Sequence, residues 1–385
     1  MYTENGLEID AGKTRVGLIC VNNNIPPVKR FIHFAEIRRR RGAVIILTAV
    51  AILTLTASTV LVLVRFSLNE YRAASQLAQK EKALQLAQSG IETGILFLTK
   101  ISVDQLYEFG LFSMTPTVPL GGGVISLTFK EETGKYNVNY LVRMFADANG
   151  QDSADERQLE YFKRLSISMG LPADIWDVVV DYIDENNVPM PKGAERDDYA
   201  RLIPPRRIKN GRMQSIEELL FIPGFDYKML YEDVRLSWRI KETSTSSLTD
   251  LEKAIINPDD QILVNNLTVY LPYSAASSNL ININSAPYHV IVALSEFMTP
   301  VAAKKIMMAR AKKMGRLKGM QDLMTIPELQ INTTGTIKLI DEIKDRITFN
   351  DQLYTIVAEA SIDTQSAQVM GVLDPLARRL VFYTE

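Results

Sequence analysis

The stretch RRRRGAVIILTAVAILTLTASTVLVLV, residues Arg38–Val64, decides how this chain is organised. Its last 22 residues, Ala43–Val64, contain no charged side chain. As a helix they would extend ~33 Å, which is enough to cross a hydrocarbon core of ~30 Å. The four arginines before them favour a cytoplasmic N-terminus. The pattern therefore predicts one transmembrane helix over 43–64, with everything after Arg65 on the far side of the membrane.

Charge and residue usage differ between the two sides of this segment. Residues 1–42 hold eight Lys/Arg against four Asp/Glu, whereas the whole chain of 385 residues has a net charge of −2. The part after the leader is therefore acidic, which argues against general nucleic-acid binding. The only cysteine, Cys20, precedes the membrane segment, so no disulfide forms within one chain. His289 is the only histidine that follows it, and we expect neither a Ser-His or Cys-His catalytic site nor a multi-histidine zinc site.

The helical pattern continues beyond the membrane. One apolar side chain recurs every seven residues: Leu77, Leu84, Ile91 and Leu98. Three small residues lie on the neighbouring face: Ala87, Gly90 and Gly94. This spacing predicts an amphipathic helix whose apolar stripe packs on its own domain, and whose small residues allow close approach of a sheet or another helix.

Alternating runs at both ends of the external region predict β-strands. The first two are GGVISLTFKEE (122–132) and GKYNVNYL (134–141). Val124, Leu127 and Phe129, then Tyr136 and Val138, predict short strands joined by a turn at Glu132–Gly134. Three more follow near the C-terminus, at 354–362, 367–374 and 378–385. Together they predict an antiparallel sheet laid on the long helix, a pilin-like α+β fold.

The segment between the strand groups has helical patterns instead, so we expect an all-helical insertion of about 148–351. Ser215, with Glu218 three residues later, predicts a capping box at one helix start. The expected layout is a leader (1–42), a membrane helix (43–64), a helix continuation with the first strands (65–147), the insertion (148–351) and the last strands (352–385).

Several motifs resemble one known family. Gly42 between a basic run and an apolar helix resembles the prepilin peptidase site of type IV pilins and pseudopilins. The segment Asp177–Phe225, with its Asp-rich helix end, Gly-Ala-Glu turn and SIEEL start, is similar to general secretion pathway protein K, the large minor pseudopilin of type II secretion. Leu280–Leu294 (LININSAPYHVIVAL) resembles the entry to a helix-hairpin-helix (SAM-like) unit, which Leu317–Leu329 closes. The likeness runs from about Gly42 to the C-terminus.

The resemblance implies an assembly protein and not an enzyme. It implies cleavage between Gly42 and Ala43, methylation of the new N-terminus, and a single-pass inner-membrane protein with most of its chain in the periplasm. Leu47 replaces the glutamate that most pilins carry at the fifth mature position, as in the K type, and this favours the tip of the filament. The implied partners are I- and J-type minor pseudopilins, the major pseudopilin and the prepilin peptidase, with no nucleic acid or small-molecule substrate. Other minor pseudopilins would dock on the helix through its small-residue face.

A calcium site is a further expectation. Seven carboxylates lie within residues 177–198, and the spacing of Asp177, Asp181 and Asp184 places three of them on one helix face. Hard oxygen ligands suit Ca²⁺, and calcium occurs in this region of the family. We expect Asp184, Glu195 and Asp198 to be ligands that fix a long loop, although a merely solvated acidic face has the same pattern.

Other interpretations stay open at this stage. The apolar segment is also compatible with a signal peptide or an uncut anchor. The helix-hairpin-helix resemblance and the basic residues of 304–318 are compatible with a membrane-anchored DNA receptor, but Ser295–Thr299 replaces the glycine hairpin that phosphate binding needs. A type IV pilus minor pilin would share the leader and the sheet. Paired carboxylates are compatible with an anchored hydrolase.

Overall fold

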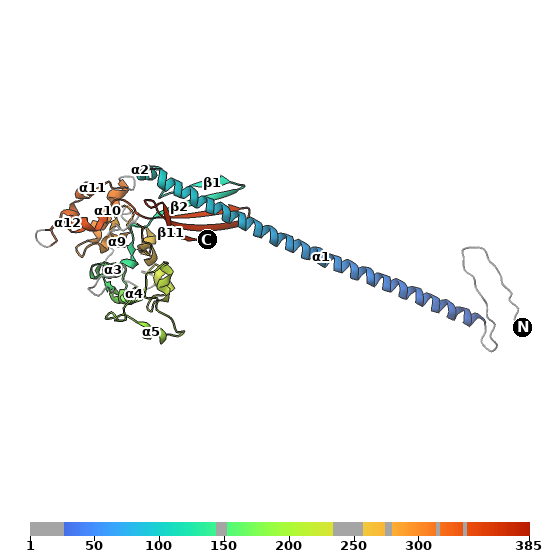
Figure 1. The fold of residues 1–385 in the computed structure, drawn as a ribbon. Helices are drawn as coiled ribbons and strands as arrows, with labels where there is room; N and C mark the ends of the chain where they lie inside the picture. Colours follow the sequence, from blue (N-terminus) through green and yellow to red (C-terminus); the bar gives the residue numbers. More distant parts are fainter. Residues whose placement is uncertain (1–26, 144–151, 234–256, 274–278, 313–315, 334–336) are drawn as a thin grey trace. The chain divides into compact units, whose positions relative to one another are not determined.

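The structure is a computed structural model. It describes residues 27–143, 152–233, 257–273, 279–312, 316–333 and 337–385, and for 27–41 the backbone alone. The chain divides into two compact units, residues 1–75 and 76–385. Helix α1 (Pro27–Lys100) begins in the first unit and ends in the second (Figure 1).

The first unit is described only by its part of α1. Within the described residues, one helix is long and apolar enough to cross a membrane, and it is this one. Its polar side chains satisfy their own hydrogen bonds, because the hydroxyls of Thr48, Thr54 and Ser58 donate to carbonyls three residues earlier. The apolar side chains are exposed in this unit taken alone. Both properties suit a helix that lies in lipid.

The second unit contains an antiparallel five-stranded sheet of order β1-β2-β9-β10-β11. Its strands are β1 (Thr117–Leu120), β2 (Gly123–Glu131), β9 (Tyr354–Ile362), β10 (Gln365–Asp374) and β11 (Arg379–Thr384). The three predicted C-terminal strands are present, and the pilin-like pairing of a long helix with an antiparallel sheet is confirmed. Because the insertion enters after β2 and leaves before β9, strands far apart in sequence lie side by side, with Leu127 opposite Ala358.

One core is formed by the inner face of this sheet and the last turns of α1. On β2 the buried residues are Ile125, Leu127 and Phe129, which alternate as the pleat requires. Val124 lies in β2 as predicted, but its side chain points to the other face and is exposed. The short helix α2 (Val103–Glu108) adds Leu106 to the same core and starts at a capping box of Ser102 and Gln105.

A second and larger core belongs to the insertion. Its α-helices are α3 (Glu156–Met169), α4 (Trp176–Ile183), α5 (Arg196–Ala200), α6 (Tyr227–Tyr231), α9 (Tyr288–Ala293), α10 (Pro300–Lys312), α11 (Met320–Met324) and α12 (Leu339–Ile343). Local signals set their ends. Asp155 caps α3 by accepting hydrogen bonds from the backbone N–H of Arg157 and Gln158, and Gly170 ends it with φ 74°. The capping box of Ser215 and Glu218 forms as predicted, at the start of a 3₁₀ helix.

Two predictions for the insertion need correction. It is not all-helical, because four short strands of the described residues lie in it and pair in two-stranded ladders, two of them with strands that precede residue 148. Their strands are β3 (Tyr136–Asn137), β4 (Val142–Arg143), β5 (Ser153–Ala154), β6 (Leu267–Thr268), β7 (Ile281–Asn282) and β8 (Ile347–Thr348). The run 134–141 forms only two strand residues, which pair in parallel with β6, and then a 3₁₀ turn. Tyr136 and Val138 fill the insertion core instead of extending the sheet. The expected boundary at 147/148 lies outside the described residues.

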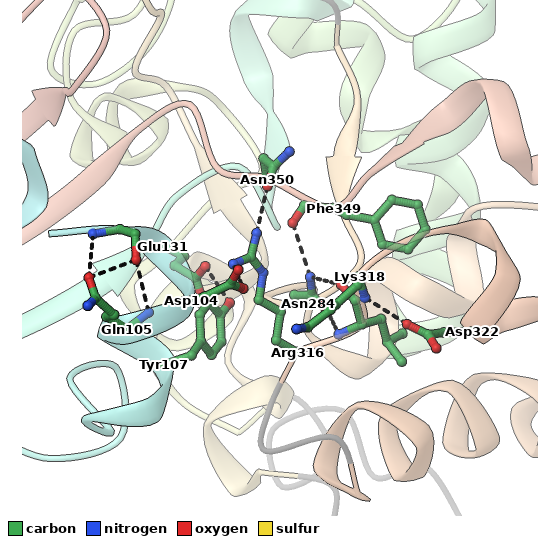
Figure 2. A network of polar contacts seen from close by, with 12 residues as sticks. Asp104, Gln105, Tyr107, Glu131, Asn284, Arg316, Lys318, Asp322, Phe349 and Asn350 are labelled. Atoms are coloured by element: carbon green, nitrogen blue, oxygen red, sulfur yellow. Dashed lines mark hydrogen bonds and ion pairs between the residues drawn. The ribbon is translucent and has the colours of Figure 1, made fainter.

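Polar contacts join the insertion to the sheet. Arg316 pairs with Asp104 of α2, donates to Asn350 and lies over the ring of Tyr107 (Figure 2). In the same network Asn284 holds Leu317 and Phe349 by hydrogen bonds to their backbone atoms. Arg316 thereby connects the insertion to α2 and to the segment that leads into β9.

Candidate assembly helix and carboxylate cluster

The predicted stripe on α1 is buried only in its second half. Ile91 and Leu98 are buried and Leu84 is partly buried, whereas Leu77 is 69% exposed. The sheet ends at the β9–β10 turn, where the Gln79 amide donates to Asp363. Leu77 lies beyond that turn, and its expected packing on the domain is therefore wrong.

The small residues of α1 face the sheet of the same chain. Ala87, Gly90 and Gly94 are buried there. A Cβ placed on Gly90 would lie 2.8 Å from the Cβ of Ala358, and one on Gly94 would lie 2.7 Å from a methyl of Ile356. Glycine is thus needed for the helix to approach the strands. The expectation that another subunit docks on this face is corrected, since the chain's own sheet occupies it.

Other parts of α1 remain accessible. In the second unit Leu96 is 56% exposed, a residue that the heptad argument did not single out. In the first unit Ala43 and Leu47 are exposed, and the helix continues through Gly42 without a break. No finding tests whether a peptidase cuts after Gly42, so that statement stays a prediction.

Four carboxylates of the Asp-rich segment converge at α4 and the loop after it. Asp177, Asp181 and Asp184 lie on the buried side of α4 and its C-cap, and Glu195 from the loop is buried beside them. We call these four residues the carboxylate cluster. Two members hold the loop through its backbone, because Lys192 N–H donates to Asp177 (3.1 Å) and Met190 N–H donates to Asp181 (3.0 Å).

The loop passes close to the carboxylate of Asp181. A Cβ on Gly193 would lie 1.8 Å from an oxygen of Asp181, so no side chain fits at that position. The sequence marked this glycine only as part of the Gly-Ala-Glu turn, because its close approach to Asp181 arises only when the loop folds back on α4. The fixing of the long loop, which we expected from a cation, is therefore supplied in part by backbone N–H groups.

The cluster carries unbalanced negative charge. Burial, with the nearby Glu195 and Asp177 carboxylates, raises the pKa of Asp181 to about 6. Burial, with Asp181 and Glu195, raises the pKa of Asp184 to about 7, and burial also raises the pKa of Glu195. Within the described residues no ion pair neutralises these groups. Four oxygens are buried without a hydrogen-bond partner: Asp177 Oδ1, Asp184 Oδ1, Glu195 Oε1 and Glu195 Oε2.

These orphaned oxygens fit the donor chemistry of a Ca²⁺ site. Within the described part of the chain, however, no three Asp, Glu, His or Cys side chains are already arranged around a metal-sized position. Binding would have to draw the carboxylates together. Asp198 does not fit the expected role, because it is exposed, caps Glu195 N–H through one oxygen and contacts Arg201 through the other.

His289 is held inside the insertion. Its Nδ1 lies 3.1 Å from Ser168 Oγ and its Nε2 lies 3.0 Å from Gln261 Oε1, with 5% of the residue exposed. Sequence reasoning did not predict this Ser-His contact, since the two residues are 121 positions apart. The contacts connect α9 to α3 and to the segment around Gln261, so His289 helps to hold the fold together.

Comparisons with known proteins give one consistent result. A family model described as "Type II secretion system (T2SS), protein K" matches residues 134–235. Type II secretion system protein K of Pectobacterium carotovorum subsp. carotovorum is 32% identical over 112 residues, which are 28% of this chain and 34% of that protein. The Pseudomonas aeruginosa protein K is 27% identical over 139 residues, 34% of this chain and 40% of its own length. The matches thus span little more than a third of these relatives.

The fold agrees over a longer region. A chain in the crystal structure of the GspK-GspI-GspJ complex from the enterotoxigenic Escherichia coli type 2 secretion system matches with a TM-score of 0.51 and 14% identity. The match covers 83% of this chain and 98% of that one. Residues 134–235, which include the carboxylate cluster, thus match the protein K family model, and the fold of a longer part of the chain is similar to that of the solved chain.

Proposed function

We propose that this chain is a minor pseudopilin of a type II secretion system, which acts by assembly and not by catalysis. The observation that carries the proposal is a protein K domain inserted into a pilin-like helix and sheet. The similar solved chain comes from a complex with GspI and GspJ. Proteins of these two types, together with the major pseudopilin, are the partners we propose.

The exposed part of α1 is the surface that we propose for anchoring and docking. The sheet covers Ala87, Gly90 and Gly94, so partners must use other residues of the helix. Ala43–Val64 would lie in the inner membrane, and Leu96 would contact a neighbouring subunit in the periplasm. None of these contacts requires a reactive group, so the proposed role is the binding of other subunits.

The tip position is part of the proposal. Leu47 offers no carboxylate to the N-terminus of a neighbouring subunit. The insertion adds a second core larger than that of the sheet, and its bulk would hinder a further subunit from stacking above it. Both features restrict the chain to one end of a filament.

We also infer that α9 and α10 form a helix-hairpin-helix unit used for packing. Arg310, one of the basic residues of this region, donates to the carbonyl oxygens of Ile283, Asn284 and Ala286 inside the insertion. Arg316 is engaged with Asp104 and Asn350. Two of the cations that a DNA receptor would present to phosphates thus serve the fold, which supports packing over DNA binding.

Calcium binding to the carboxylate cluster is a separate part of the proposal. Asp177, Asp184 and Glu195 would hold the ion, because each has an oxygen that is buried without a partner. The ion would neutralise charge that the loop brings together, and it would thereby stabilise the loop. Calcium binding can be measured by calorimetric titration of the full chain, with Asp184→Asn as the variant and exposed Asp197→Asn as the matched control.

The deciding experiment is the intact mass and N-terminal residue of the chain expressed with and without a prepilin peptidase. A product that begins at Ala43 and carries a methyl group supports the pilin-like pathway. An uncut chain beside an active peptidase overturns it and favours a plain anchor or a DNA receptor. Co-purification with I- and J-type pseudopilins then separates this function from that of a type IV pilus minor pilin.

A further inference from the structure

Two carboxyl groups meet where the sheet joins the insertion. Glu131 ends β2, and Asp351 lies between β8 and β9. Their carboxyl groups lie within hydrogen-bonding reach of each other, and both residues are partly buried. Two carboxylates cannot hydrogen-bond without a proton between them, because neither has a donor when ionised.

The neighbouring donors decide which residue carries the proton. Asp351 accepts hydrogen bonds from Thr133 N–H (2.9 Å), from the Asn282 amide and from the Ser285 hydroxyl (3.4 Å). Glu131 accepts one, from the Tyr107 hydroxyl at 2.6 Å (Figure 2). Three donors favour the ionised form of Asp351, so Glu131 is the neutral acid that donates to it.

Among the residues that the structure describes, the charges around this pair balance one negative group and no more. Arg310 of α10 is the cation that attracts Glu131, and it is shared with Asp260. Arg316 is paired with Asp104 and lies near the rings of Tyr107 and Tyr354. Tyr107 and Tyr354 are neutral, since burial raises the pKa of both hydroxyls. A second ionised carboxylate at this position would therefore lack a partner.

We propose that Glu131 and Asp351 share one proton and form a proton-dependent lock between the sheet and the insertion. Asp351 connects three segments: the exit of β2 through Thr133, strand β7 through Asn282, and the entry to β9. When the shared proton is lost, Glu131 and Asp351 are both negatively charged and repel each other at that connection. The lock is then closed in acid and loosens as the pH rises.

The sign follows from proton binding. Burial and the Asp351 charge hold the pKa of Glu131 well above its usual range. Between the unfolded and the folded pKa the folded chain binds more protons than the unfolded chain, so its stability falls as the pH rises through that interval. The proposal stands apart from the secretion role, and failure of one leaves the other intact.

The test compares the full chain with Glu131→Gln, in detergent and with saturating calcium so that the carboxylate cluster is held constant. A glutamine accepts from Tyr107 and donates to Asp351 at every pH. We expect the wild-type Tm to fall as the pH rises above the ordinary range of a glutamate, and the variant to show a flatter curve and a Tm roughly 2–4 °C higher at the alkaline end. Exposed Glu359→Gln on β9 is the matched control.

Infrared spectroscopy gives an independent readout that does not depend on stability. The wild type should show a neutral carboxylic acid component in its carbonyl stretch that disappears at alkaline pH. The difference between the spectra of the wild type and Glu131→Gln should isolate this component from the bands of Asp181 and Asp184. Hydrogen exchange in peptides covering 131–135 and 280–286, corrected for its intrinsic pH dependence, should accelerate with pH in the wild type alone. Parallel Tm curves for wild type and Glu131→Gln, or an unchanged infrared band, would overturn the lock.

Discussion

The two cores of the second unit are built by different physics. The sheet core consists of apolar side chains from α1, β2, β9 and β10, placed by simple alternation. The insertion core is larger, and many polar side chains are buried in it, among them Asn139, Asn266 and Asn284. Apolar packing is insensitive to pH and ions, whereas buried amides and carboxylates depend on their partners. The comparison predicts that the stability of the sheet core is insensitive to pH and ions, whereas that of the insertion core depends on them.

The largest effect that we expect is in the sheet core. Phe129→Ala removes a buried ring that packs on α1 and beside Phe97, and we expect it to cost about 3–5 kcal/mol of unfolding free energy. Denaturant unfolding at two pH values measures it, with exposed Phe109→Ala as the control. A loss that changed with pH or calcium would break the contrast between the two cores.

A slightly smaller loss should follow in the insertion from Asn139→Ala. The Asn139 amide donates to the carbonyls of Met213 and Val269 and accepts from Met213 N–H at 2.7 Å. Removing it leaves three buried backbone groups without a hydrogen-bond partner, which we expect to lower the free energy of unfolding by about 2–4 kcal/mol. Exposed Asn187→Ala is the matched control for the same denaturant measurement. Equal curves for the two variants would mean that the polar contacts contribute little.

The carboxylate cluster predicts a pH effect confined to the insertion. Because the pKa values of Asp181 and Asp184 are raised to about 6 and about 7, the folded chain holds extra protons above the ordinary range near pH 4. In a chelator, stability should therefore fall as the pH rises from about 4 to 7, by on the order of 2 kcal/mol. Asp184→Asn should reduce this slope and Asp197→Asn should not. A thermal scan series measures both variants, and a slope unchanged in Asp184→Asn would contradict the assignment.

A smaller change tests the contact between α1 and the sheet. Gly90→Ala improves helix propensity by roughly 1 kcal/mol, yet its methyl would overlap the Cβ of Ala358. We expect a net loss of about 1–2 kcal/mol from overpacking. Exposed Gln85→Ala in the same helix controls for propensity, and calorimetric Tm values compare the two. A Gly90→Ala variant more stable than the wild type would show that β9 can move enough to accommodate the added methyl group.

The smallest stability change should come from the exposed face of α1. Leu96→Ala should alter the unfolding free energy by less than about 0.5 kcal/mol, because its side chain is mostly exposed. If Leu96 contacts a neighbouring subunit as proposed, the same variant should weaken co-purification with I- and J-type partners. Exposed Glu92→Ala is the matched control on the helix. Unchanged recovery of partners would remove Leu96 from the docking surface.

Local patterns determined much of this protein. An uncharged run of 22 residues is long enough to specify a helix that could span a membrane, and period-two alternation specified β2 and the three C-terminal strands. The capping box at Ser215 and the association of the Asp-rich segment with protein K also followed from short spacings. These features depend on neighbouring residues, and local chemistry was therefore sufficient.

Only the tertiary structure decided where long-range partners meet. The small residues of α1 suited a sheet or another helix equally well, and the fold assigned them to the chain's own strands. Asp198 had the right residue type for a ligand, but its own helix cap engages it. The contact of Glu131 with Asp351 joins residues on opposite sides of the insertion. No local pattern encodes such pairs, because their energy arises from burial and charge that exist only after the chain has closed on itself.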